Sequence, residues 1–120
     1  FVVTIAGRRW PIGGLAALDP MLRSNAERMA RRATHEGSVP DVSRRGLLAA
    51  ARALRSAGLA PQPLLQVHDE VLFEVPSEEV SESARVAAEA MRGAFELEPR
   101  LQVGCEAGPS WGELSPVAPT

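Results

Sequence analysis

The sequence predicts an α+β fold with an antiparallel sheet, and three observations lead to that class. Two short apolar runs, 64–67 and 71–75, are separated by three polar residues, which is too short for a parallel crossover and therefore indicates a β-hairpin. Segments with helical spacing of apolar residues follow Asp19-Pro20 and Pro76-Ser77. Residues 101–107 alternate apolar with polar or small residues, as a half-buried strand does.

The first half of the chain reads as a strand followed by two helices. Residues 1–6 are β-branched and apolar and predict a strand that ends at a turn beginning with Gly7. Asp19 is placed to cap a helix, because Pro20 suits the first helical position. We expect this helix to be interrupted over 34–37. A second helix would then begin at Ser38, with Asp41 as its capping partner, and run to about Ala57, where Gly58 ends it.

The second half reads as the hairpin, a third helix and a last strand. The helix should extend from Ser77 to about Phe95 and bury an apolar stripe that includes Ala84 and Met91. The stripes of the first two helices would likewise be buried, through residues such as Leu22, Met29, Leu47 and Leu54. Residues 1–114 are expected to form one domain segment, and residues 115–120 a tail.

Size and composition exclude several classes of protein. With 120 residues and 45% hydrophobic side chains, the chain is expected to bury a core of its own. No apolar run is long enough to cross a bilayer, so no membrane segment is expected. A single cysteine, Cys105, excludes an internal disulfide and fits a reducing cytoplasm. Because the chain opens with Phe1 and has no signal-peptide pattern, we expect it to be a piece of a longer protein.

The charges are unevenly distributed along the chain. The net charge of -2 is unlike that of a generic nucleic-acid binder, which is usually basic. All 13 basic residues are arginine, however, and most lie between Arg8 and Arg52, whereas acidic residues gather after Asp69. This asymmetry would let one face of the molecule meet phosphate groups.

The hairpin tip, His68-Asp69-Glu70, is where we look for chemistry. A carboxylate there can be aimed at Mg²⁺, which prefers hard oxygen ligands. Neighbouring side chains of an extended chain alternate in direction, so all three are not expected to bind one ion. One aspartate cannot hold the two ions of a phosphoryl-transfer site, and a second would have to come from elsewhere. From these residues alone, an ordinary polar turn is the alternative.

Four segments, in order, resemble family A (bacterial polymerase-I-like) DNA polymerases. LLQVHDEVLFEVP, residues 64–76, resembles motif C of that family, in which V-H-D-E precedes an apolar strand. TIAGRRWPI resembles the segment after the fingers, LRSNAERMARRATHEGSVPD resembles the stretch that leads into a long palm helix, and AGPSWGEL resembles the closing G-x-x-W. The resemblance covers about residues 1–114 and implies the C-terminal part of a palm domain, with a central hairpin at about 64–75 packed against helices.

The resemblance implies a role for each matching residue. Asp69 corresponds to the motif C aspartate that binds both metal ions, two Mg²⁺ shared with an aspartate outside this chain. His68 corresponds to a histidine that touches the primer strand, and Glu70 to a supporting acidic residue. DNA contacts are implied for five arginines: Arg8, Arg9, Arg23, Arg28 and Arg32. A hairpin turn for Arg8 and Arg9, and a solvated helix face for Arg23 and Arg28, are the alternatives that the residues themselves leave open.

Three positions depart from the family pattern. Arg32 and Glu36 stand where the family usually has Asn and Gln, which read hydrogen-bond acceptors in the DNA minor groove. Arg32 can still donate to such acceptors or hold a phosphate, whereas ionised Glu36 cannot donate and would repel DNA. Either the local contact differs, or Glu36 pairs with Arg32 away from the DNA, or the member is degenerate. Pro40 replaces a usual Ala, which the first turn of the expected second helix could accept.

The function implied is template-directed nucleotidyl transfer to a primer 3′ end, in replication or repair. The partners would be primer–template DNA, deoxynucleoside triphosphates and the remainder of the polymerase, with no membrane, in the cytoplasm (at a bacterial nucleoid or phage-encoded). The fingers, the thumb and motif A are absent, so the isolated chain is expected to be inactive. The alternatives are a small subunit of a split polymerase, and a degenerate, non-catalytic DNA-binding or structural module.

Overall fold

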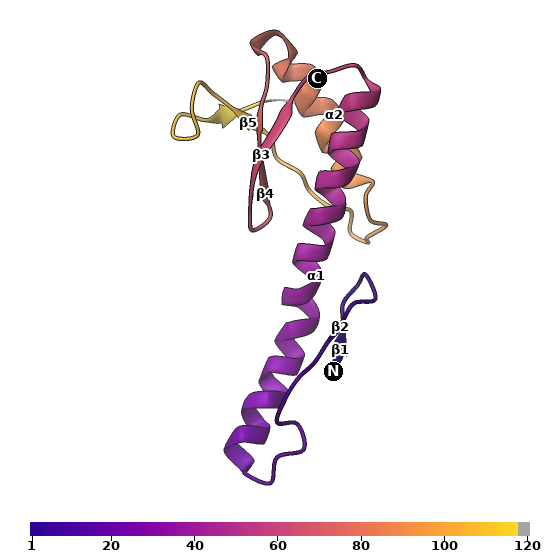
Figure 1. Ribbon diagram of the computed structural model, residues 1–120, viewed down its shortest axis with the longest axis vertical. Coiled ribbons are helices and arrows are strands. Elements are labelled where there is room, and N and C mark those ends of the chain that lie inside the picture. The colour runs from indigo at the N-terminus through magenta and orange to yellow at the C-terminus, as the bar shows by residue number, and fades with distance from the viewer. Residues whose placement is uncertain (118–120) are drawn as a thin grey trace. The chain divides into compact units, whose positions relative to one another are not determined.

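The computed structural model describes residues 1–117 and has an α+β fold, as the sequence predicts (Figure 1). The chain divides into two compact units, Phe1–Val42 and Ser43–Thr120, each described by itself below. One helix, α1 (Pro20–Ser56), contributes its first part to the first unit and its last part to the second. No helix of the described residues is long and apolar enough to cross a membrane.

Within residues 1–117, three separate antiparallel pairs of strands form instead of one sheet. In the first unit β1 (Val2–Val3) pairs with β2 (Arg9–Trp10). In the second unit β3 (Gln62–Val67) pairs with β4 (Glu70–Glu74), which confirms the hairpin, and β5 (Glu106–Ala107) pairs with β6 (Ser115–Pro116).

The strands expected over 1–6 and 101–107 are therefore much shorter than predicted, and the expected single sheet is not formed within residues 1–117. Residues 115 and 116 of the expected tail form β6, which pairs with β5. The remainder of the expected tail, 118–120, lies outside the described residues.

Both ends of α1 agree with the sequence. The Asp19 carboxylate accepts a hydrogen bond from the backbone N–H of Met21 over 2.8 Å, as a helix cap does. At the other end Gly58 has a φ of +73°, and Leu59 N–H donates to the carbonyl of Leu54 over 3.1 Å. A left-handed glycine with this backward hydrogen bond is the Schellman ending of a helix.

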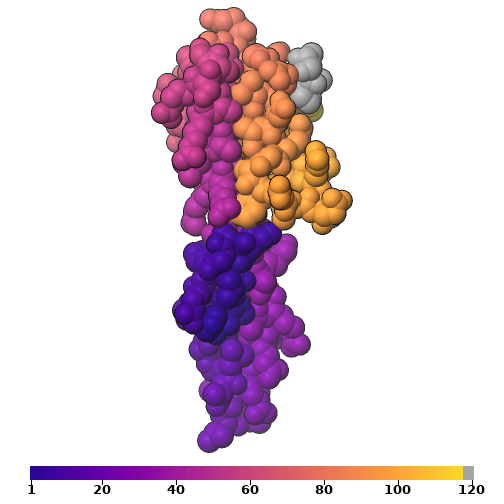
Figure 2. All heavy atoms as spheres, turned by 90° about the vertical axis from the view of Figure 1, so that its right-hand side faces the viewer, coloured from indigo at the N-terminus to yellow at the C-terminus, as the bar shows by residue number. Residues whose placement is uncertain are grey.

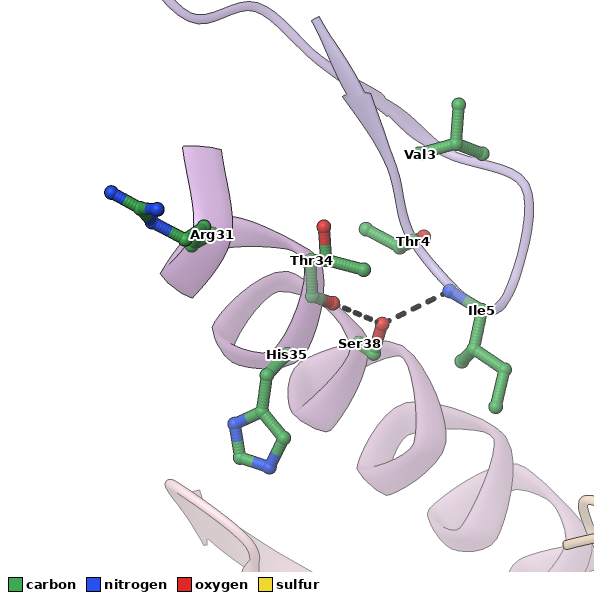
Figure 3. Close-up of a pocket in the computed structure, with 7 residues that line it drawn as sticks. All are labelled: Val3, Thr4, Ile5, Arg31, Thr34, His35 and Ser38. Carbon is green, nitrogen blue, oxygen red and sulfur yellow. Dashed lines mark hydrogen bonds between the residues drawn. The ribbon is translucent and has the colours of Figure 1, made fainter. Parts of the chain in front are cut away.

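The expected break at 34–37 is wrong, because α1 is continuous through it. Ser38 lies inside the helix, where its hydroxyl donates to the carbonyl of Thr34 and accepts from the N–H of Ile5 over 3.0 Å (Figure 3). Asp41, expected to cap a second helix, instead accepts a hydrogen bond from Arg8. The hydrogen-bonding side chains of both residues serve the N-terminal segment and not a helix start.

Pro40 stands inside the helix, where a proline normally costs about 3 kcal/mol because it lacks an N–H and crowds the preceding turn. The carbonyl that loses its helical donor is the one four residues before the proline, that of Glu36. The next carbonyl, that of Gly37, accepts a hydrogen bond from Nη2 of Arg8 over 2.9 Å. A donor from the N-terminal segment thus contacts the helix backbone beside the hydrogen bond that the proline removes.

In the first unit, the N-terminal segment lies closely on α1 (Figure 2). Gly37 makes this possible, because a Cβ there would come within 2.6 Å of Cε3 of Trp10 and 2.9 Å of Cγ2 of Thr4. Thr4 is buried, and so are Ala26 and Ala33 of α1. Leu22 and Met29, which the sequence predicted to be buried, are 57% and 56% exposed.

In the second unit, α2 (Val80–Arg92) packs against the last part of α1. It follows a short 3-10 turn, Ser77–Glu79, and ends three residues before the predicted Phe95, where Gly93 caps it. Met91 lies against Gly46 of α1, and Arg45 lies 4.5 Å from the centre of the Phe95 ring. Among the described residues of this unit, the buried apolar side chains are those of Ala50, Leu54 and Ala88.

Candidate functional site

The tip of the β3–β4 hairpin carries the candidate metal ligand. Val67 and Glu70 are the last pair of the ladder, so His68 and Asp69 form a two-residue loop. The amide of the Gln66 side chain donates to the carbonyl of His68 over 3.3 Å and ties the loop to β3. All three residues of the predicted site, His68, Asp69 and Glu70, are exposed.

His68 has a φ of +54°, the only positive value for a residue other than glycine within 1–117. Two-residue hairpin loops require positive φ at their first position, and glycine usually supplies it. A histidine tolerates this conformation better than most residues but still carries strain. The loop therefore keeps an imidazole at a position where glycine would be easier for the backbone.

Asp69 has a carboxylate with no hydrogen-bond or ion-pair partner among the residues that the structure describes. Over the same residues, no group of three His, Cys, Asp or Glu side chains could hold a metal ion. The exposed carboxylate is a suitable oxygen ligand for a divalent cation, but this chain would supply only part of a coordination shell. The residues fit a shared metal site and do not fit a complete one.

The five predicted DNA-binding arginines all belong to the first unit, and the hairpin tip belongs to the second. Arg8 is engaged within the fold: its Nε donates to Oδ1 of Asp41 over 3.0 Å, with side-chain exposures of 44% and 9%. Arg8 also lies 5.5 Å from the centre of the Trp10 ring. Its role in packing the N-terminal segment is thus visible, and a contact with DNA stays a prediction.

The other four arginines lie on the surface. Arg9 stacks on the ring of Phe1, 3.8 Å from its centre, and remains exposed. On α1, Arg23 is exposed, and Arg28 donates from Nη2 to Oδ1 of Asn25. Arg32 is 69% exposed at its side chain and forms an ion pair with Glu36, one turn further along. The pairing of Arg32 with Glu36, which one of the three alternatives supposed, is therefore present, and its position relative to DNA stays a prediction.

Sequence reasoning missed the contact between Arg8 and Asp41, since it assigned Asp41 to a helix cap. A signal was present: Gly37 and Pro40 disfavour a helix by propensity, so a helix that continues through them needs support from another segment. The long segment 20–56 has no other strong breaker near Pro40 apart from Gly37. Had one helix been expected, a donor such as Arg8 would have been sought.

The family model described as DNA polymerase family A matches residues 1–113, nearly the whole chain. The chain belongs to DNA polymerase family A. The family A resemblance of the four sequence segments is thereby confirmed, and so is the expected α+β class, since a solved polymerase domain matches the chain in three dimensions.

Two curated relatives and one solved structure illustrate this membership. The chain is 39% identical over 119 residues to DNA polymerase I of Chloroflexus aurantiacus and 36% identical over 111 residues to DNA polymerase I of Bacillus subtilis. These matches cover 98% and 92% of the chain. It also matches the POL domain of Pol1 from M. smegmatis in complex with DNA primer-template and dNTP, with a TM-score of 0.78 and 36% identity over 83% of this chain.

The chain spans only 12% and 13% of the length of those two relatives, and 18% of the solved polymerase chain. Family A membership therefore applies to a segment. What the complete relatives do is not automatically what these 120 residues do.

Proposed function

We propose that residues 1–114 are the C-terminal part of the palm of a family A DNA polymerase and supply one metal-binding carboxylate, that of Asp69. The observation that carries this proposal is the Asp69 side chain itself. It is exposed at the end of a tightly closed hairpin and has no partner among the described residues. A carboxylate kept free of internal partners, in a segment that cannot complete a metal site alone, suits a site shared with another part of the polymerase.

The hairpin's contribution to nucleotidyl transfer would be positional. When bound, two Mg²⁺ ions activate the primer 3′ hydroxyl and neutralise charge on the triphosphate. Asp69 would hold them in common with a carboxylate outside this chain. His68, which precedes it in the loop, would contact the primer strand near its 3′ end, and Glu70 would support the site from the first position of β4.

The proposed partners are primer–template DNA and a deoxynucleoside triphosphate, in the cytoplasm. The solved relative that the chain resembles was captured with both ligands. On this chain, α1 carries eight arginines and three acidic residues within Pro20–Ser56, which suits contact with phosphates. The DNA-binding set proposed is Arg8, Arg9, Arg23, Arg28, Arg32 and His68.

The remaining partner is the rest of the polymerase, whether in the same chain or in a separate subunit. Large apolar side chains are exposed in both units, including Leu18, Met21, Leu64 and Leu65. On the hairpin, Leu64 and Leu65 are 57% and 46% exposed, at the point where the register of β3 against β4 shifts between Pro63 and Leu65. Exposed apolar side chains that lie close together suit a contact with other protein.

A chimera tests the proposal. Residues 1–113 would replace the matching segment of Bacillus subtilis DNA polymerase I, and template-dependent primer extension would be measured. We expect extension, and expect Asp69→Asn to lower its rate by about a thousandfold or more, since a metal-bound charge is lost. Glu106→Gln, the same change at an exposed carboxylate of β5, should leave the rate unchanged.

A folded chimera that binds primer–template but extends no primer would contradict the proposal, as would full activity of Asp69→Asn. The isolated 120-residue chain should show no extension at any enzyme concentration tested. Template-dependent synthesis by that chain, abolished by Asp69→Ala, would show that it carries a complete site of its own.

A further inference from the structure

Arg32 and Glu36 form a paired polar group on the surface of α1. Both Nε and Nη2 of Arg32 reach the same carboxylate oxygen, Oε1 of Glu36, over 2.9 and 2.7 Å. The side chains are 69% and 52% exposed, so the pair is open to a ligand. The contact leaves both hydrogens of Nη1, and one of Nη2, without a bond to Glu36.

The two side chains face the same hollow of the first unit. A shallow cavity of about 160 Å³ is lined by both of them and by four apolar neighbours: Trp10, Ile12, Met29 and Ala33. A group that enters this hollow, or passes over its rim, can contact the Arg32 guanidinium while the neighbouring Glu36 carboxylate cancels its charge. Their effects on such a ligand are therefore coupled.

Arg32 is unlike its neighbours on the same stretch of α1. Arg23, Arg28 and Arg31 have no ion pair within the described residues, so each presents its full charge. Only Arg32 in this group has its charge cancelled. The pair also adds little to the helix, because an arginine four residues before a glutamate is the less favourable order.

We propose that Arg32 and Glu36 act on DNA as one neutral donor group: Glu36 holds the guanidinium and cancels its charge. Arg32 then offers N–H donors to base or sugar acceptors without acting as a phosphate-binding cation. This inference rests on the proposed function, which brings DNA to α1. Glu36 is in this account a positioning residue, and its carboxylate does not touch the DNA.

The test is the salt dependence of DNA binding by the 120-residue chain, measured by fluorescence anisotropy with a labelled primer–template duplex. Each phosphate neutralised steepens the plot of log K against log salt by about 0.9. Glu36→Gln releases one cation, so we expect a slope steeper by about 0.9 and binding tighter by roughly eightfold at 0.1 M salt. Arg32→Gln with Glu36→Gln should return the slope to the wild-type value.

Arg23→Gln is the matched control, since Arg23 belongs to the proposed DNA-binding set, is exposed on the same stretch of α1 and has no ion pair within the described residues. It should make the slope shallower by about 0.9, and its effect should add to that of Glu36→Gln without coupling. Circular dichroism would verify that each variant keeps the helix content of the wild type.

The possible failures are distinguishable. If the chain binds DNA but Glu36→Gln leaves both the slope and the affinity unchanged, the pair is an ordinary surface ion pair, and this inference is overturned while the proposed function stands. If neither the wild type nor any variant binds the duplex, the proposed DNA contact of α1 fails, and the inference fails with it.

Discussion

Arg8 and Asp41, which are 33 residues apart in sequence, are joined by a hydrogen bond of 3.0 Å between Nε and Oδ1. The same guanidinium donates to the carbonyl of Gly37, one turn before Asp41 on α1. Arg8 therefore ties the N-terminal strand pair to the helix at the position where Pro40 interrupts its hydrogen bonds. Because the Asp41 side chain is only 9% exposed, water screens this contact less than it screens an ion pair between two exposed side chains.

Removing either partner of this contact should destabilise the chain. We expect Arg8→Gln and Asp41→Asn each to lower the free energy of unfolding by about 1–3 kcal/mol, the usual loss for a hydrogen bond to a charged group. The double variant should lose less than the sum of the two. Urea unfolding followed by circular dichroism measures this.

Arg9→Gln is the control for these variants, since Arg9 is exposed and only stacks on Phe1. Arg9→Gln should lower the free energy of unfolding by less than about 1 kcal/mol. Equal losses for Arg8→Gln and Arg9→Gln would show that the contact with Asp41 adds nothing to stability.

Two glycines of α1 should respond oppositely to alanine. A Cβ at Gly37 would stand 2.6 Å from the Trp10 ring, so overpacking of about 1–3 kcal/mol should exceed the gain of about 1 kcal/mol in helix propensity. A Cβ at Gly46 would meet the side chain of Met91 at ordinary contact distances, nearest its terminal methyl at 3.4 Å, so Gly46→Ala should stabilise the chain by up to about 1 kcal/mol. Thermal melting compares the stability of each variant with that of the wild type. Stabilisation by Gly37→Ala would show that the N-terminal segment does not pack on α1 in solution.

The elements predicted well are those whose signals are local. The hairpin followed from two apolar runs joined by a short polar tip, and both ends of α1 followed from Asp19 and Gly58. The continuity of α1 through its middle could not be predicted from local signals. Gly37 and Pro40 are helix-breaking residues by propensity, but contacts with Trp10 and Arg8 from the N-terminal segment override it.

The candidate site was predictable only in part. The motif places Asp69 at a hairpin tip, and the structure keeps it there, exposed. The described residues hold no group of three possible metal ligands, so neither the local sequence nor this fold shows what would share a metal ion with Asp69. Burial was overestimated for Leu22 and Met29 for a related reason, since an apolar stripe indicates that a face is covered but not which protein segment covers it.

His68 should show a conflict between stability and function. Its φ of +54° suits glycine, so we expect His68→Gly to be at least as stable as the wild type, by up to about 1 kcal/mol. His68→Val should be destabilised by about 1–2 kcal/mol, since a β-branched residue resists this conformation. In the polymerase chimera both variants should extend primers more slowly, because both lose the imidazole. Unchanged extension by the glycine variant would mean that the histidine has no part in primer contact.

Cys105 offers a pH-dependent readout of packing in the second unit. Burial raises the pKa of its thiol above the usual value, and the nearby positive charge of Arg92 opposes this rise. Only the thiolate reacts with iodoacetamide, so below the pKa the rate should rise about tenfold per pH unit and should stay below that of the urea-unfolded chain.

Arg92→Gln removes the opposing charge and should raise the thiol pKa further, which slows alkylation at pH 8, whereas Arg92→Lys keeps the charge and should change the rate little. The raised pKa of the Cys105 thiol also makes stability depend on pH. The unfolded chain loses the thiol proton at lower pH than the folded chain, so the free energy of unfolding should fall as pH rises from the usual thiol pKa to the raised one. Cys105→Ala should abolish this part of the pH dependence. Alkylation of the native chain as fast as that of the unfolded chain would show that the packing of Cys105 beside α2, where its thiol lies 3.6 Å from the carbonyl of Ala84, does not persist in solution.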